Sequence, residues 1–175
     1  MSGLNEIATL IANIALALSL IVALVFGIAQ VKAAARDRRE RLTLETLRAF
    51  HSQEFAGFIY NITNGRTPAT GAELNALPPS EQIPVIQFAQ QMESLGMLVS
   101  DGVIDLDLVE KTLGSFVITA WEKYRPVFLD MREKNNDPFM AEYFQSLAQL
   151  LDKRMRDNPR QPAYRAANIA SPSNP

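Results

Sequence analysis

Residues 14–42, IALALSLIVALVFGIAQVKAAARDRRERL, change within a few positions from an apolar run to a cluster of arginines. The apolar run belongs to a longer segment, residues 7–31, which holds no charged residue and no proline over 25 positions. A helix needs roughly 20 such residues to cross the hydrocarbon core of a membrane. We therefore predict one transmembrane helix at residues 7–31, preceded by a short external N-terminus at residues 1–6.

Two alternatives to a retained membrane anchor are a buried core helix and a cleaved signal peptide. A core helix of this length without a charged face is unusual in a soluble chain of 175 residues. A signal peptide has a basic start and a shorter apolar segment. This chain instead carries Glu6 before the segment and its basic residues after it, although KAAA at residues 32–35 resembles a cleavage site. The sequence favours the anchor.

A basic segment directly after the apolar run predicts the orientation of the anchor. Basic residues beside a span stay in the cytoplasm, and here five of them outnumber two acidic residues. We expect the N-terminus outside a bacterial inner membrane, the remaining chain in the cytoplasm, and contact between the basic segment and anionic lipid head groups. The five residues are Lys32, Arg36, Arg38, Arg39 and Arg41.

Small side chains recur along one side of the predicted span. At about 100° per residue they occupy roughly a third of the helix circumference. Because lipid gives helices no hydrophobic reason to associate, small residues that permit close backbone approach favour packing. The pattern predicts packing against another membrane helix, from a second copy or from a different membrane protein, although alanine is also common by chance in spans. This small-residue row consists of Ala8, Ala12, Ala15, Ser19, Ala23 and Gly27.

Apolar residues at helical spacing predict that the rest of the chain is an all-α cytoplasmic bundle with an irregular C-terminal tail. Residues 32–63 are the juxtamembrane basic segment and a helical stem. Residues 64–80, which hold proline and glycine, are a linker, and residues 81–157 are the helical domain. Residues 158–175 are an extended tail rich in proline, serine and asparagine, which cannot bury enough apolar surface to fold alone.

Four residues are predicted to begin or end helices in this bundle. Gly96 ends one helix, and Gly102 forms the following turn. Asp105 or Asp107 caps the next helix, at about 106–134, by accepting hydrogen bonds from free backbone N–H groups. Asp137 caps the last helix, which begins at a proline. Within the long helix, Pro126 is expected to produce a kink.

Residues that carry catalysis or bind metal ions are scarce. The chain has no cysteine and a single histidine, His51, so a zinc site is improbable. Glycine loops that cradle phosphate and nucleophile motifs are missing, and the stretch DGVID at 101–105 lacks three ligands of a calcium loop. The basic residues form two short patches, which argues against nucleic-acid binding. We therefore expect no cofactor, no metal ion and no catalytic activity.

Two segments resemble an uncharacterised bacterial family of small, single-span membrane proteins with an all-helical cytoplasmic domain. They are MESLGMLVSDGVIDLDLVEKTLGSFVITAWEKYRPVFLDMRE at 92–133 and DPFMAEYFQSLAQLL at 137–151. In this pattern a glycine, a Gly-x-Ile-Asp turn and a mid-helix Trp-Glu-Lys-x-x-Pro follow one another. The resemblance implies the architecture above and supplies no active site.

Taken together, these features suggest a non-catalytic accessory subunit of a bacterial inner-membrane protein complex. Respiratory and photosynthetic assemblies are the specific expectation. The alternative is a membrane-anchored signalling or recruitment module that acts through its cytoplasmic helical domain, alone or as a homodimer.

Overall fold

The computed structural model describes residues 2–64 and 67–165, and this part of the chain is helical without strands. The all-α prediction is therefore confirmed. The chain divides into two compact units, Met1–Leu42 and Thr43–Pro175.

A single long helix, α1 (Ser2–Arg48), contains the predicted span. Its most apolar 18-residue window has a mean hydropathy of 2.6, and none of that window is buried. By length and composition this helix is able to cross a membrane. The helix continues through the basic segment without a break, because nothing between the span and Arg48 is a strong helix breaker.

The second unit begins inside α1, within the predicted basic segment and helical stem at residues 32–63. After α1 comes the short 3-10 helix η1 (Ala49–His51), and then α2 (Gln53–Thr63). Ser52 interrupts the predicted helical stem with an extended backbone, and its hydroxyl accepts a hydrogen bond from the Phe55 amide at 3.1 Å. Phe55, Phe58 and Ile62 are buried, so the predicted stem contributes part of the bundle core.

The predicted linker at 64–80 also differs from the structure, because it contains helix α3 (Gly71–Ala76). Thr70 and Glu73 form a reciprocal cap: the Thr70 hydroxyl accepts from the Glu73 amide, and the Glu73 carboxylate accepts from the Ala69 amide. The Asp130 carboxylate, from another helix, accepts from the Gly71 amide at 2.9 Å. This segment is therefore attached to the bundle.

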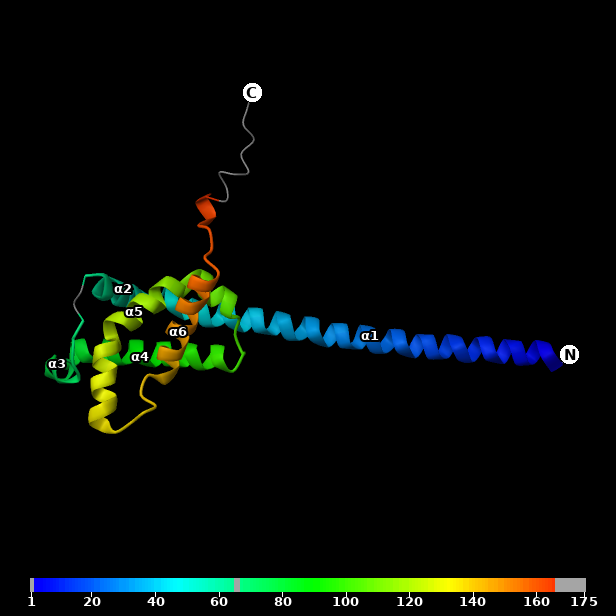
Figure 1. Ribbon diagram of the computed structural model, residues 1–175, viewed down its shortest axis with the longest axis horizontal. Coiled ribbons are helices and arrows are strands. Elements are labelled where there is room, and N and C mark those ends of the chain that lie inside the picture. The colour runs from blue at the N-terminus through cyan, green and yellow to red at the C-terminus, as the bar shows by residue number, and fades with distance from the viewer. Residues whose placement is uncertain (1, 65–66, 166–175) are drawn as a thin grey trace, which may run out of the picture. The chain divides into compact units, whose positions relative to one another are not determined.

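Three longer helices complete the bundle: α4 (Pro79–Ser100), α5 (Leu106–Asn135) and α6 (Glu142–Asp157). Helix α6 packs against both α4 and α5. Proline residues stand at the start of α4, where the N–H group that proline lacks would have no partner within the helix. Helix α5 continues past Pro126 and bends along its length (Figure 1).

Aromatic rings fill the centre of the bundle around Phe88. Its ring centroid lies 5.3–6.0 Å from those of four other rings, which come from α2, α5 and α6. Burying a side chain of this kind contributes about 1.5–3 kcal/mol, so this cluster is a main source of stability. The four neighbours are Phe58, Phe116, Tyr124 and Phe144.

Candidate functional site

The small-residue row lies on α1, and its side chains are exposed apart from the half-buried Gly27. A Cβ atom added at Gly27 would have nothing within 4 Å. The row therefore has space for the backbone of another helix. The structure contains one chain, so which helix packs there stays a prediction.

The basic segment follows on the same helix. Lys32, Arg36, Arg38, Arg39 and Arg41 are all exposed on α1. An exposed cationic collar next to an apolar helix suits the interface between a membrane and the cytoplasm. Lipid binding and orientation remain predictions.

Gly96 does not end a helix, contrary to the prediction, because α4 continues to Ser100. Its role is close packing. A Cβ atom at this position would lie 2.2 Å from the carbonyl oxygen of Tyr143, a separation that real contacts do not reach. The missing side chain therefore allows the first turn of α6 to approach the backbone of α4.

The same junction contains an interhelical cap from Glu93. Its two carboxylate oxygens accept hydrogen bonds from the amides of Tyr143, at 3.1 Å, and Phe144, at 2.9 Å. These amides lie in the first turn of α6 and have no partner within the helix. A carboxylate also complements the positive end of the helix dipole. Glu93, which lies on α4, therefore caps the start of α6 in place of a residue from the preceding turn.

Asp137 does not cap α6, which begins five residues later than this residue. Its carboxylate instead accepts from the Phe139 amide at 3.0 Å, within the turn that follows α5. Phe139 also precedes α6 and is 68% exposed. The Arg132 guanidinium holds this turn by donating from Nε and Nη2 to the Met140 carbonyl, at 3.1 and 2.7 Å.

Gly102 and Asp105 occupy the predicted positions between α4 and α5. Gly102 has a φ of 65°, a conformation that favours glycine. Asp105 Oδ1 accepts from the amides of Asp107, at 2.8 Å, and Leu108, at 3.1 Å, at the start of α5. The Asp105 amide donates to the hydroxyl of Thr43, which is fully buried, at 2.7 Å. No sequence signal points to Thr43, because this contact joins residues 62 positions apart.

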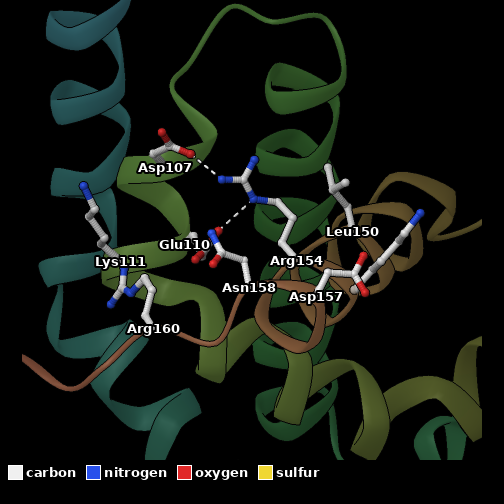
Figure 2. A pocket seen from close by; sticks show the side chains of 9 residues that line it. Asp107, Glu110, Lys111, Leu150, Arg154, Asp157, Asn158 and Arg160 are labelled. Carbon is white, nitrogen blue, oxygen red and sulfur yellow. Dashed lines mark hydrogen bonds and ion pairs between the residues drawn. The ribbon is translucent and has the colours of Figure 1, made fainter.

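A hollow of about 580 Å³ lies between the start of α5 and the end of α6 (Figure 2). Arg154 Nε donates to the Glu110 carboxylate at 2.8 Å, and its guanidinium also pairs with Asp107. The bond to Glu110 raises the pKa of Arg154 above its ordinary value, so this arginine stays charged and joins the two helices. Lys111 and Arg160 lie to one side of this ion pair (Figure 2).

The lining of this hollow contains carboxylates, cations and amide groups but no histidine, serine or threonine. Among residues 2–64 and 67–165, no three His, Asp or Glu side chains are grouped so that they suit a metal ion.

Tyr124 is the one titratable core residue with a strong perturbation among the described residues. Its side chain is 1% exposed, and burial raises the pKa of the phenol to about 12. The hydroxyl therefore keeps its proton throughout the physiological range.

Two further hollows flank α4. One of about 330 Å³, here called the polar groove, lies beside Thr46 and Phe50 and is lined by uncharged residues that include three glutamines. The other, of about 250 Å³, is here called the apolar hollow. Its lining includes Leu74, Phe128, Met131 and Met140. The sequence pattern indicates neither of them, because each combines residues from helices far apart in the chain.

No curated protein and no solved structure matches the chain. A family model described as Domain of unknown function (DUF4760) matches residues 14–151, from within the apolar run to the last two turns of α6. This match covers most of the chain and confirms the predicted resemblance to an uncharacterised family. The chain is thus a member of the DUF4760 family, whose function is unknown.

Proposed function

We propose that the protein is a non-catalytic, single-span accessory subunit of a bacterial inner-membrane protein complex. Helix α1 anchors it, the small-residue row packs against a partner helix, and the bundle covers the partner's cytoplasmic face. The observation that carries this proposal is the surface of α1.

That surface is incompatible with water over most of its length. Fourteen large apolar side chains between Ile7 and Val31 are each 50–76% exposed on α1. Burying a side chain of this kind is favourable by about 1.5–3 kcal/mol when complete, so their transfer out of water is strongly favourable in sum. Lipid and a partner helix provide this environment. The basic segment that follows supports the cytoplasmic placement of the bundle.

The structural hydrogen bonds and ion pairs of three polar residues are consistent with a non-catalytic role. Arg154, Glu93 and Asp105 each have partners that stabilise helix packing or helix ends. Such groups maintain the shape of the bundle.

The experiment that tests the proposal is affinity capture of the tagged full chain from native membranes in mild detergent, with mass spectrometry of the captured proteins. We expect stoichiometric recovery of one membrane assembly. The double variant Ala23→Leu with Gly27→Leu fills the small-residue row and should release the chain from that assembly. Val25→Leu with Ile28→Leu is the matched control, because these substitutions change side chains outside the row. Capture of no membrane protein would contradict the proposal.

The apolar hollow favours a second function, recruitment of a soluble partner by a membrane-anchored module. An apolar cavity that opens on the bundle between Leu74, Met131 and Met140 suits a side chain inserted by such a partner. In the capture experiment this function predicts recovery of a soluble protein without membrane subunits. Recovery of membrane subunits that depends on the small-residue row would exclude it.

A further inference from the structure

Basic residues gather where α6 ends. Residues 153–165 hold five basic residues and one acidic residue, whereas residues 43–152 hold seven basic and fifteen acidic residues. The second unit therefore has one short stretch of net positive charge on an acidic background. The five basic side chains are all exposed: Lys153, Arg154, Arg156, Arg160 and Arg165.

Ion pairs neutralise two of these five residues. Arg154 pairs with the carboxylates of α5 described above, and Arg156 pairs with Asp152. Three cations that line the hollow at the end of α6 have no ion pair within residues 2–64 and 67–165. Two of the three lie together on one side of the Arg154 ion pair (Figure 2). We call these three residues the basic edge: Lys111, Lys153 and Arg160.

The residues after α6 add an aromatic side chain of a type that is common at membrane surfaces. Tyr164 is 66% exposed, and the Arg165 guanidinium lies 5.8 Å from the centroid of its ring. Tyrosine is enriched at membrane–water interfaces, where its apolar ring and polar hydroxyl both find a suitable environment. An exposed tyrosine four residues after Arg160 therefore complements the basic edge as a lipid-binding surface.

The basic edge lies at the end of the second unit where α1 enters it. Thr43 is the first residue of this unit, and its hydroxyl accepts a hydrogen bond from the amide of Asp105, the cap of α5. Lys111 follows within two turns of that cap. Val31, the last residue of the predicted span, precedes Thr43 by twelve positions on α1, which is about 18 Å of helix. Lipid head groups extend about 5–8 Å beyond the hydrocarbon core, so they come within about 10–13 Å of Thr43 along this helix.

We propose that the basic edge and Tyr164 dock on anionic phospholipid head groups of the membrane that holds α1. This inference rests on the proposed function, because it requires α1 to span that membrane. Unpaired cations complement the negative charge of the cytoplasmic leaflet, and the short tether through α1 keeps the bundle at a high effective concentration of lipid. Each basic residue near such a surface raises the ratio of docked to undocked bundles about fivefold.

Energy transfer from the bundle to labelled lipid tests this docking in the absence of other proteins. The chain has no cysteine, so Gln161→Cys in the full chain supplies one thiol for a fluorescent donor beside Arg160. The purified protein is reconstituted into vesicles of phosphatidylcholine alone, or of equimolar phosphatidylcholine and phosphatidylglycerol, each with an acceptor-labelled lipid. We expect greater transfer in the vesicles that contain phosphatidylglycerol, and loss of this gain at high salt.

A donor at Ser80 is the matched control for position. Ser80 is exposed in the first turn of α4, and about 33 Å of helix separates it from the loop that leads to α5. Energy transfer from Ser80→Cys should therefore not increase with phosphatidylglycerol. An equal increase from both positions would overturn the proposal, because it would show that the whole bundle approaches the lipid without a preferred surface.

Two double variants of the Gln161→Cys protein test the charges themselves. Lys111→Gln with Arg160→Gln removes two cations of the basic edge, so the ratio of docked to undocked bundles should fall at least tenfold. Arg125→Gln with Lys134→Gln leaves the same net charge and changes exposed residues elsewhere on α5, so it should keep the wild-type transfer. Equal losses in both variants would overturn the proposal.

Flotation of the vesicles distinguishes failure of the docking from failure of the anchor. A chain that floats with both kinds of vesicle but transfers energy equally in both refutes the docking and leaves the anchor intact. A chain that does not float with either kind refutes the anchor, and the docking that rests on it.

Discussion

Replacing Gly96 with alanine tests the packing of α4 against α6. The added Cβ atom would lie 2.2 Å from the oxygen and 2.6 Å from the carbon of the Tyr143 carbonyl. Carbon atoms in favourable contact lie about 3.5–4.0 Å apart, so the two helices must separate by about 1 Å. Both obstacles are backbone atoms in the first turn of α6, and the Glu93 cap holds this turn in place.

Two opposing effects determine how much Gly96→Ala changes the free energy of unfolding. Overpacking a tight core costs about 1–3 kcal/mol, and contact with backbone places Gly96→Ala at the upper end of that range. Alanine also stabilises a helix by about 1 kcal/mol relative to glycine. We therefore expect a net loss of about 2 kcal/mol in the free energy of unfolding.

Gly114→Ala is the matched control, because Gly114 is also a buried glycine inside a long helix. Its Cβ atom would lie 3.6 Å from Glu110 Cγ and from Met155 Sδ, which is ordinary van der Waals contact. Only the helix propensity remains, so this variant should gain about 0.5–1 kcal/mol.

The assay is a urea titration of the full chain in detergent, followed by tryptophan fluorescence. Trp121 is the single tryptophan, is 6% exposed, and lies 5.2 Å from the Phe144 ring of α6. Its emission therefore reports on the bundle without interference from α1. The two alanine variants should shift the midpoint in opposite directions. A shift in the same direction would refute the close approach of Tyr143 to Gly96.

Three further variants test individual contacts of the bundle. Glu93→Gln replaces one of the two carboxylate acceptors of α6 by an amide donor and removes the charge, so it should cost about 1–2 kcal/mol in the same titration; Glu122→Gln, on the exposed side of α5, should change nothing. Asp105→Ala removes the cap of α5 and should cost about 1 kcal/mol, and an unchanged midpoint would contradict that role. In a spectrophotometric titration at 295 nm, one of the four tyrosines should ionise near pH 12 and disappear in Tyr124→Phe. Because the folded state keeps a proton that the unfolded state loses near pH 10, the stabilising effect of this raised pKa is complete below pH 10 and is lost towards pH 12.

Local chemistry made several features of the fold predictable from sequence. Asp105 caps the helix that begins at the next residue, and Gly102 has a positive φ in the turn just before it. Because both roles depend only on neighbouring residues, the residue types were sufficient to predict them. The uninterrupted apolar run likewise predicted α1. A local signal was available for α3 as well, because Thr70 and Glu73 have the spacing of a capping box. The nearby prolines instead favoured the prediction of a linker.

Contacts between distant residues account for the differences between the predictions and the structure. Gly96 has the residue type of a helix end, and only the position of Tyr143 shows that it permits a close approach. Asp137 followed by proline has the pattern of a helix start, yet the carboxylate of Glu93, from α4, caps α6 five residues later. The polar groove combines Thr46, at the end of α1, with residues of η1 and α4. Such arrangements depend on the assembled bundle and leave no pattern in one segment.

Membrane topology is the most direct test of the central claim that α1 anchors a cytoplasmic bundle. The test uses cells that express the Gln149→Cys variant, which places a single exposed thiol on α6. We predict that the full chain stays in the membrane pellet after alkaline carbonate extraction. We also predict that a membrane-impermeant maleimide labels the thiol only after the inner membrane is permeabilised. Release of the chain by carbonate, or labelling while the inner membrane is intact, would contradict the claim.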